Sequence, residues 1–140
     1  MTVSIEIVEH PTEEVVDAFA RLLPQLSSAA PPDATELATI ISGSTVFVAR
    51  VDGVIVGTLT LVLYHIATGL KAWIEDVVVD VSARGHGVGE ALSRAALERA
   101  RRHGAKAVSL SSRPSRADAN RLYQRIGFSA RDTNVYRYDL

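Results

Sequence analysis

Apolar residues along the chain repeat with two different periods, and each change of period marks an expected element. Alternation of apolar and polar residues from Val3 to Val8 predicts a half-buried strand. Helical spacing then predicts a helix that begins at Thr12 and kinks or ends at Pro24. A second short helix is expected after Asp33, which forms a capping-box pattern with Glu36.

Three β-rich segments follow the second helix. Thr45 to Val51 and Val54 to Tyr64 flank Asp52-Gly53, a dipeptide that favours a tight hairpin turn. Lys71 to Val81 is the third expected strand. It ends in the apolar run Val77, Val78 and Val79, which is typical of a strand covered on both faces.

Helices and strands alternate in the remainder of the chain. An apolar face from Val88 to Ala100 predicts a long helix that stops at Gly104. Ala105 to Leu110 is a short strand that can pair in parallel with the strand before this helix. A last helix from Pro114 to Gly127 and a final strand from Asn134 to Asp139 complete the pattern.

The predicted fold class is α/β (α+β): a mixed, mostly antiparallel sheet flanked by helices, in the order β-α-α-β-β-β-α-β-α-β. One domain over residues 1–140 is expected, because this length is the commonest domain size. Fifteen basic and sixteen acidic residues leave a net charge of −1, which predicts no nucleic-acid partner. The absence of cysteine fits a reducing, cytoplasmic location, and neither a secretory signal nor a membrane span is expected.

Three glycines gather in the segment Arg84-Gly85-His86-Gly87-Val88-Gly89, between an apolar strand and a long helix. Unpaired N–H groups and the positive helix end meet there, so the segment favours a phosphate or pyrophosphate ligand. Glu90 stands where a P-loop or a dinucleotide fingerprint needs another residue, which disfavours both. The alternative is a glycine-rich turn with no ligand.

The four scattered histidines lack the spacing of a metal site, so no metal is expected.

This segment matches the Gln/Arg-x-x-Gly-x-Gly/Ala signature of the GNAT N-acetyltransferase superfamily, which the sequence resembles. A second segment, Ala119-Asn120-Arg121-Leu122-Tyr123 followed by Gly127-Phe128, is similar to the family's Asn-x-x-Tyr-x-x-x-Gly-Phe helix. The two motifs cover about Trp73 to Phe128, and the expected order of elements resembles the family over almost the whole chain.

The resemblance implies acetyl-CoA as cosubstrate, held in a splay between the two parallel strands. Backbone N–H groups from Arg84 to Gly89 would bind its pyrophosphate, and the strand at Val77 to Val79 would bind the pantetheine as an added strand. Asn120 would contact the cofactor arm. Tyr123 would lie near the thioester sulfur as general acid, the alternative being an ordinary core tyrosine.

Acetyl transfer to an amine also needs a base, for which Glu75 and Asp76 are the candidates. Neighbouring strand residues point to opposite faces, so normally one of them reaches the acceptor, and we favour Glu75. A bulge in this strand would reverse that parity. The alternative is a solvent-facing carboxylate pair. A backbone N–H of Val77 to Val79 would meet the oxyanion.

The expected reaction is transfer of acetyl to a primary amine by direct attack in a ternary complex, because no cysteine can carry the acetyl group. A small or polyamine-like amine is favoured as acceptor. A protein N-terminus, a lysine, or a non-catalytic acyl-CoA sensor are the alternatives. The Tyr64-His65 loop either shapes the choice of acceptor or is plain surface. Family members often pair as homodimers, in which Asn134 to Tyr138 is a candidate contact.

Overall fold

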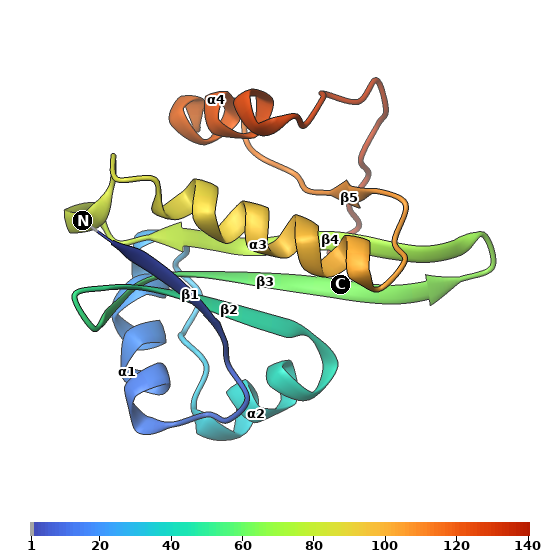
Figure 1. Cartoon of the computed structure of the whole chain (residues 1–140). Coiled ribbons are helices and arrows are strands. Elements are labelled where there is room, and N and C mark those ends of the chain that lie inside the picture. The colour runs from blue at the N-terminus through green and yellow to red at the C-terminus, as the bar shows by residue number, and fades with distance from the viewer. Residues whose placement is uncertain (1) are drawn as a thin grey trace. The chain divides into compact units, whose positions relative to one another are not determined.

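The structure is a computed structural model that describes residues 2–140. These residues fall into two compact units, one ending at Leu110 and the other running from Ser111 to Leu140, and each is described by itself. The first unit holds a five-stranded sheet (Figure 1). Its strands, in their order across the sheet, are β1 (Val3–Ile7), β2 (Thr45–Val51), β3 (Val54–Ile66), β4 (Gly69–Val79) and β5 (Val108–Ser109).

The sheet is mixed, as predicted. β1 to β4 form consecutive antiparallel pairs, whereas β5 lies parallel to β4. Only two residue pairs join β4 and β5 in register, Ala72 with Val108 and Trp73 with Ser109. The predicted strand at residues 105–110 is therefore shorter than expected, and β4 continues from residue 74 to residue 79 without a β5 partner.

Two helices lie on one face of this sheet and a third on the other (Figure 1). α1 (Glu13–Leu22) continues into the 3-10 turn η1 (Leu23–Gln25), because Pro24 cannot extend an α-helix. α2 (Ala34–Gly43) begins with the predicted capping box of Asp33 and Glu36. α3 (Val88–Arg102) covers the opposite face.

The core beneath α1 and α2 contains Val46 and Val48 of β2 and Val78 of β4, together with buried residues of both helices. On the opposite face, Gly57 of β3 lets α3 approach closely. A Cβ atom there would lie 3.1 Å from Val88 Cγ1. The first residues of β3 thus pack against the start of α3, with the Gly57 backbone close to the Val88 side chain.

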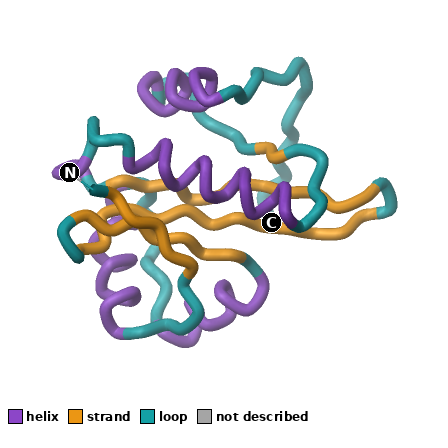
Figure 2. Tube along the Cα trace, viewed as in Figure 1, coloured by secondary structure: helices purple, strands orange, loops and turns teal. Residues whose placement is uncertain are grey.

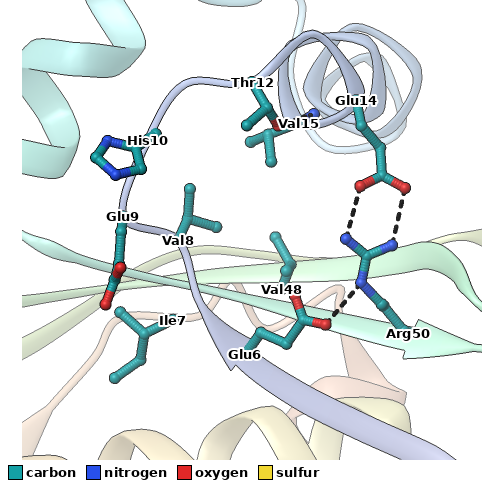
Figure 3. Close-up of a pocket in the computed structure, with 10 residues that line it drawn as sticks. All are labelled: Glu6, Ile7, Val8, Glu9, His10, Thr12, Glu14, Val15, Val48 and Arg50. Atoms are coloured by element: carbon teal, nitrogen blue, oxygen red, sulfur yellow. Dashed lines mark hydrogen bonds and ion pairs between the residues drawn. The ribbon is translucent and has the colours of Figure 1, made fainter.

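A three-residue ion cluster joins β1, β2 and α1 at the surface (Figure 3). The Arg50 guanidinium donates to both carboxylate oxygens of Glu14, at 2.6 and 2.8 Å, and its Nε donates to Glu6 at 2.8 Å. The hydrogen bonds from Arg50 to Glu14 hold the pKa of the Glu14 carboxyl below its usual value. The pocket beside the cluster contains none of the site residues predicted from the sequence.

The second unit contains the helix α4 (Ala117–Ile126), which Gly127 ends in a left-handed conformation. The strand predicted at residues 134–139 is wrong, since residues 127–140 form no strand (Figure 2). Alternation alone is insufficient, because a strand needs a neighbour for its hydrogen bonds, and residues 111–140 contain no other strand. Accordingly Val135, Tyr136 and Tyr138 are at least 80% exposed.

Candidate active site

The connection between β4 and α3 has the backbone that the glycine segment predicts. After the 3-10 turn η2 (Val81–Ala83), Gly85 has φ 82° and Gly87 has φ 79°. These left-handed conformations favour glycine over residues that carry a Cβ atom. Gly87 is also the N-cap of α3, and no side chain caps the helix there. The start of a 15-residue helix is therefore left open.

Several backbone donors in this segment have no acceptor. Across residues 2–140, the N–H groups of residues 85–89 make no hydrogen bond to another protein atom. A Cβ atom built at Gly85 or Gly87 meets no atom within 4 Å, so the space in front of the loop is free. Arg84 is exposed, and its Nε donates a hydrogen bond to Val79 O at 3.3 Å. The residues present fit a diphosphate group.

A brace from α1 and η1 supports the approach to this loop. Arg21 donates to Asp80 Oδ2 at 3.3 Å and to Ile55 O at 3.1 Å. Asp80 Oδ1 accepts 3.0 Å hydrogen bonds from the N–H and the hydroxyl of Ser82, and chiefly the Ser82 N–H lowers the pKa of the Asp80 carboxyl. Gln25 accepts from Val81 N at 3.0 Å. The brace fixes η2, from which the glycine loop departs.

β4 contains a bulge at the two candidate base residues. Asp76 has φ 50°, and the register with β3 shifts between Thr58 and Thr60. Thr58 pairs with Val78 and Thr60 pairs with Glu75, so Glu75 and Val78 share one face although they are three residues apart. That face is the one packed under α1 and α2. Both Glu75 and Asp76 are exposed.

The edge of β4 beyond this bulge faces no strand of the sheet. β5 pairs only with residues 72 and 73, so residues 74–79 present an unpaired edge on that side. An extended chain that carries amide groups, such as pantetheine, can bind such an edge as an added strand. The predicted residues Val77, Val78 and Val79 lie in this segment.

Tyr123 and Asn120 belong to the second unit. Tyr123 is 6% exposed, and its ring packs edge-on against Phe128 with centroids 5.6 Å apart. Burial raises the pKa of the Tyr123 phenol above its usual value, and the charge of Arg116 offsets part of this increase. Asn120 donates from Nδ2 to Arg113 O at 2.9 Å, so it holds the loop that precedes α4.

The first unit brings together the predicted residues from Glu75 to Val79 and the loop from Arg84 to Gly89, on successive parts of one connection. Sequence reasoning missed Arg21, Gln25 and Asp80. The hydrogen bonds from Arg21 to Asp80 and from Val81 to Gln25 each join residues more than 50 positions apart, so no local pattern marks them. Among the described residues no cluster of three or more metal-ligating side chains is found, and none of their helices is long and apolar enough to cross a membrane.

Comparison with known proteins identifies the class. The model of the acetyltransferase (GNAT) family matches residues 12–128. The chain therefore belongs to this family, whose members use acetyl-CoA as cosubstrate, and it is an acetyltransferase by family membership. A comparison with curated proteins gives no significant match.

Solved structures show the same fold. An acetyltransferase of Trypanosoma brucei is 31% identical with a TM-score of 0.78, over 99% of this chain and 100% of that one. A ribosomal-protein-alanine N-acetyltransferase from Brucella melitensis is 24% identical with a TM-score of 0.80, and covers 99% of both chains. An aminoglycoside acetyltransferase from an uncultured soil metagenomic sample is 22% identical with a TM-score of 0.83, over 99% of this chain and 95% of that one.

Proposed function

We propose that the chain is an N-acetyltransferase that moves the acetyl group of acetyl-CoA to a primary amine by direct attack in a ternary complex. The observation that carries this proposal is the open start of α3, where the N–H groups of residues 85–89 have no protein acceptor. Family membership supports acetyl transfer as the reaction, and the open start of α3 supports this loop as the site where the cofactor binds.

Each part of the cofactor has candidate partners. The N–H groups from Arg84 to Gly89, which include those of His86 and Val88, bind the pyrophosphate, assisted by the Arg84 guanidinium. Val77, Val78 and Val79 bind the pantetheine along the free edge of β4. Asn120 contacts the cofactor arm. Acetyl-CoA supplies the thioester whose acetyl group passes to the amine nitrogen.

Two side chains handle the protons. Glu75 accepts a proton from the attacking amine, directly or through a water molecule, and Asp76 is the alternative base. A main-chain N–H of Val77 to Val79 donates to the thioester carbonyl oxygen. Tyr123 holds the proton that the leaving sulfur needs, because a phenol of ordinary pKa near 10 is protonated at neutral pH. Burial raises the pKa of the Tyr123 phenol further.

The acceptor that we propose is a small amine, and a polyamine-like amine, which the sequence also favours, is tested beside it. Solved structures of the same fold include enzymes named for aminoglycosides and for the alanine of a ribosomal protein, and they show the range of acceptors that the fold serves. A protein N-terminus and a lysine are therefore tested alongside small amines. We propose that the enzyme is cytoplasmic and forms a homodimer, and that residues 1–140 form one domain.

Release of free CoA measures the proposed activity. The chain is incubated with acetyl-CoA and a panel of small amines, polyamines and peptides, and the thiol is titrated. Thiol release that depends on one amine class supports the proposal. Thermal stabilisation by acetyl-CoA without thiol release across the panel would instead identify a non-catalytic sensor.

A further inference from the structure

β3 and β4 extend beyond the rest of the sheet as a two-stranded arm (Figure 1). The last residue of β3 that pairs with β2 is Leu61, opposite Thr45. At the next two pairs β5 still lies beside β4, because Ala72 and Trp73 also pair with β5. The pairs from Tyr64 with Lys71 to Ile66 with Gly69 belong to β3 and β4 alone. The expectation that Tyr64 and His65 lie in a loop is wrong, because both lie inside β3, where the arm continues the strand.

One face of this arm carries an aromatic stripe, defined here as Val62, Tyr64, Ile66 and Trp73. Val62, Tyr64 and Ile66 occupy every second position of β3 after Thr60, and Trp73 pairs with Val62. All four residues therefore lie on one face of the arm. Tyr64 is 41% exposed and Ile66 is 47% exposed, while Val62 and Trp73 are half-buried. None of the four belongs to the core beneath α1 and α2.

The stripe leads directly to the proposed base. Glu75 pairs with Thr60, on the same face and two residues beyond Trp73. At the other end Lys71 pairs with Tyr64 on this face. Glu75 and Lys71 are thus about 14 Å apart along β4. Trp73 lies between them on this face, and Tyr64 lies beside Lys71 on the neighbouring strand. The carboxylate attracts an ammonium to one end of the stripe, and the lysine repels a second ammonium from the other.

We infer that the aromatic stripe binds the body of the acceptor, and that the acceptor is a monoamine with an aromatic or other apolar body. This inference rests on the proposed function. The amine nitrogen lies at Glu75, and the apolar body covers Trp73 and Tyr64, which also attract a cation through their ring faces. A polyamine is disfavoured, because its second charge would meet Lys71.

Trp73 is the only tryptophan of the chain, so its fluorescence reports on the stripe whether or not catalysis occurs. 2-Phenylethylamine is titrated with excitation at a wavelength that it does not absorb. We expect a saturable change in fluorescence, with an apparent Kd about tenfold lower than those of ethylamine, spermidine and the uncharged 2-phenylethanol. Equal affinity for ethylamine or spermidine, or no change at all, would overturn the inference.

Variants separate this inference from the proposed function. Tyr64→Ala should raise the KM for 2-phenylethylamine about tenfold and change that for ethylamine by less than twofold. Val54→Ala, at an exposed position at the other end of β3, is the matched control and should change neither. Saturable binding without acetyl transfer would sink the proposed function, and with it the acceptor role, and would leave only the stripe as a binding site for an aromatic amine. Efficient transfer to ethylamine alone would do the reverse.

The competing occupant is a second copy of the chain. Sedimentation of the wild type and of the Tyr64→Ala variant tests it. A dimer that Tyr64→Ala dissociates, and that 2-phenylethylamine leaves unchanged, would show that the stripe is an interface between copies and would overturn the inference. A molecular mass in solution that Tyr64→Ala leaves unchanged supports the inference that the stripe binds the acceptor.

Discussion

Glu75 and Val78 lie three residues apart in β4, and yet both occupy the sheet face beneath α1 and α2. The bulge at Asp76 produces this arrangement, since an unbroken strand would put them on opposite faces. It frees Glu75 to lie on the face of the proposed acceptor while the strand continues toward the glycine loop.

Glu75→Gln should lower kcat by about 10²–10⁴-fold, because the amide cannot accept the proton of the attacking amine. The Kd for CoA should stay within about twofold, because Glu75 is not among the residues that we assign to the cofactor. Asp76→Asn is the matched control, since asparagine also tolerates the positive φ of 50°. Steady-state kinetics decide the case. A loss of kcat confined to Asp76→Asn would assign the base to Asp76 instead.

Asp76→Ala should destabilise the fold by about 1 kcal/mol relative to Asp76→Gly, because alanine tolerates a left-handed backbone poorly. Urea unfolding of the two variants measures the difference. The pair Asp52→Ala and Asp52→Gly, at φ 51° in the hairpin turn, provides the comparison. Equal stability of Asp76→Ala and Asp76→Gly would mean that the bulge is absent in solution.

Asp80 makes stability depend on pH at the acid end. Its folded pKa lies below the ordinary value, so the unfolded chain binds more protons and stability falls as pH drops through the folded pKa. Wild type should therefore lose more free energy of unfolding between pH 6 and pH 3 than Asp80→Asn does. Thermal unfolding across this range, with Asp118→Asn as an exposed control, tests the brace. Parallel pH profiles of wild type and Asp80→Asn would show that Asp80 contributes nothing to the pH dependence of stability.

Tyr123→Phe should lower kcat by about 10²–10⁴-fold and leave the Kd for CoA unchanged, because the ring stays packed on Phe128 while the proton donor is lost. Tyr136→Phe, at a position that is 87% exposed, is the matched control. Turnover of Tyr123→Phe equal to that of wild type would remove Tyr123 as the acid.

Local signals predicted most of the first unit. The capping box at Asp33, the Asp52-Gly53 turn and the glycines before α3 each act within a few residues, so the sequence displays them. The strand predicted at residues 134–139 failed because pairing depends on a neighbour that alternation cannot reveal. The brace between Arg21 and Asp80 spans 59 residues and has no local signature. The aromatic stripe likewise depends on the register of β3 with β4.

We propose that the open amides at the start of α3 bind the pyrophosphate of CoA. Calorimetric titration of CoA into wild type, Gly87→Ala and Gly104→Ala measures this binding. Gly87 and Gly104 have φ of 79° and 87° with no atom near a built Cβ, so both variants carry a similar backbone cost of about 1 kcal/mol. We expect wild type and Gly104→Ala to bind CoA alike and Gly87→Ala to bind it at least about tenfold more weakly. Absence of CoA binding by wild type, or equal binding by all three proteins, would show that these amides do not bind the pyrophosphate.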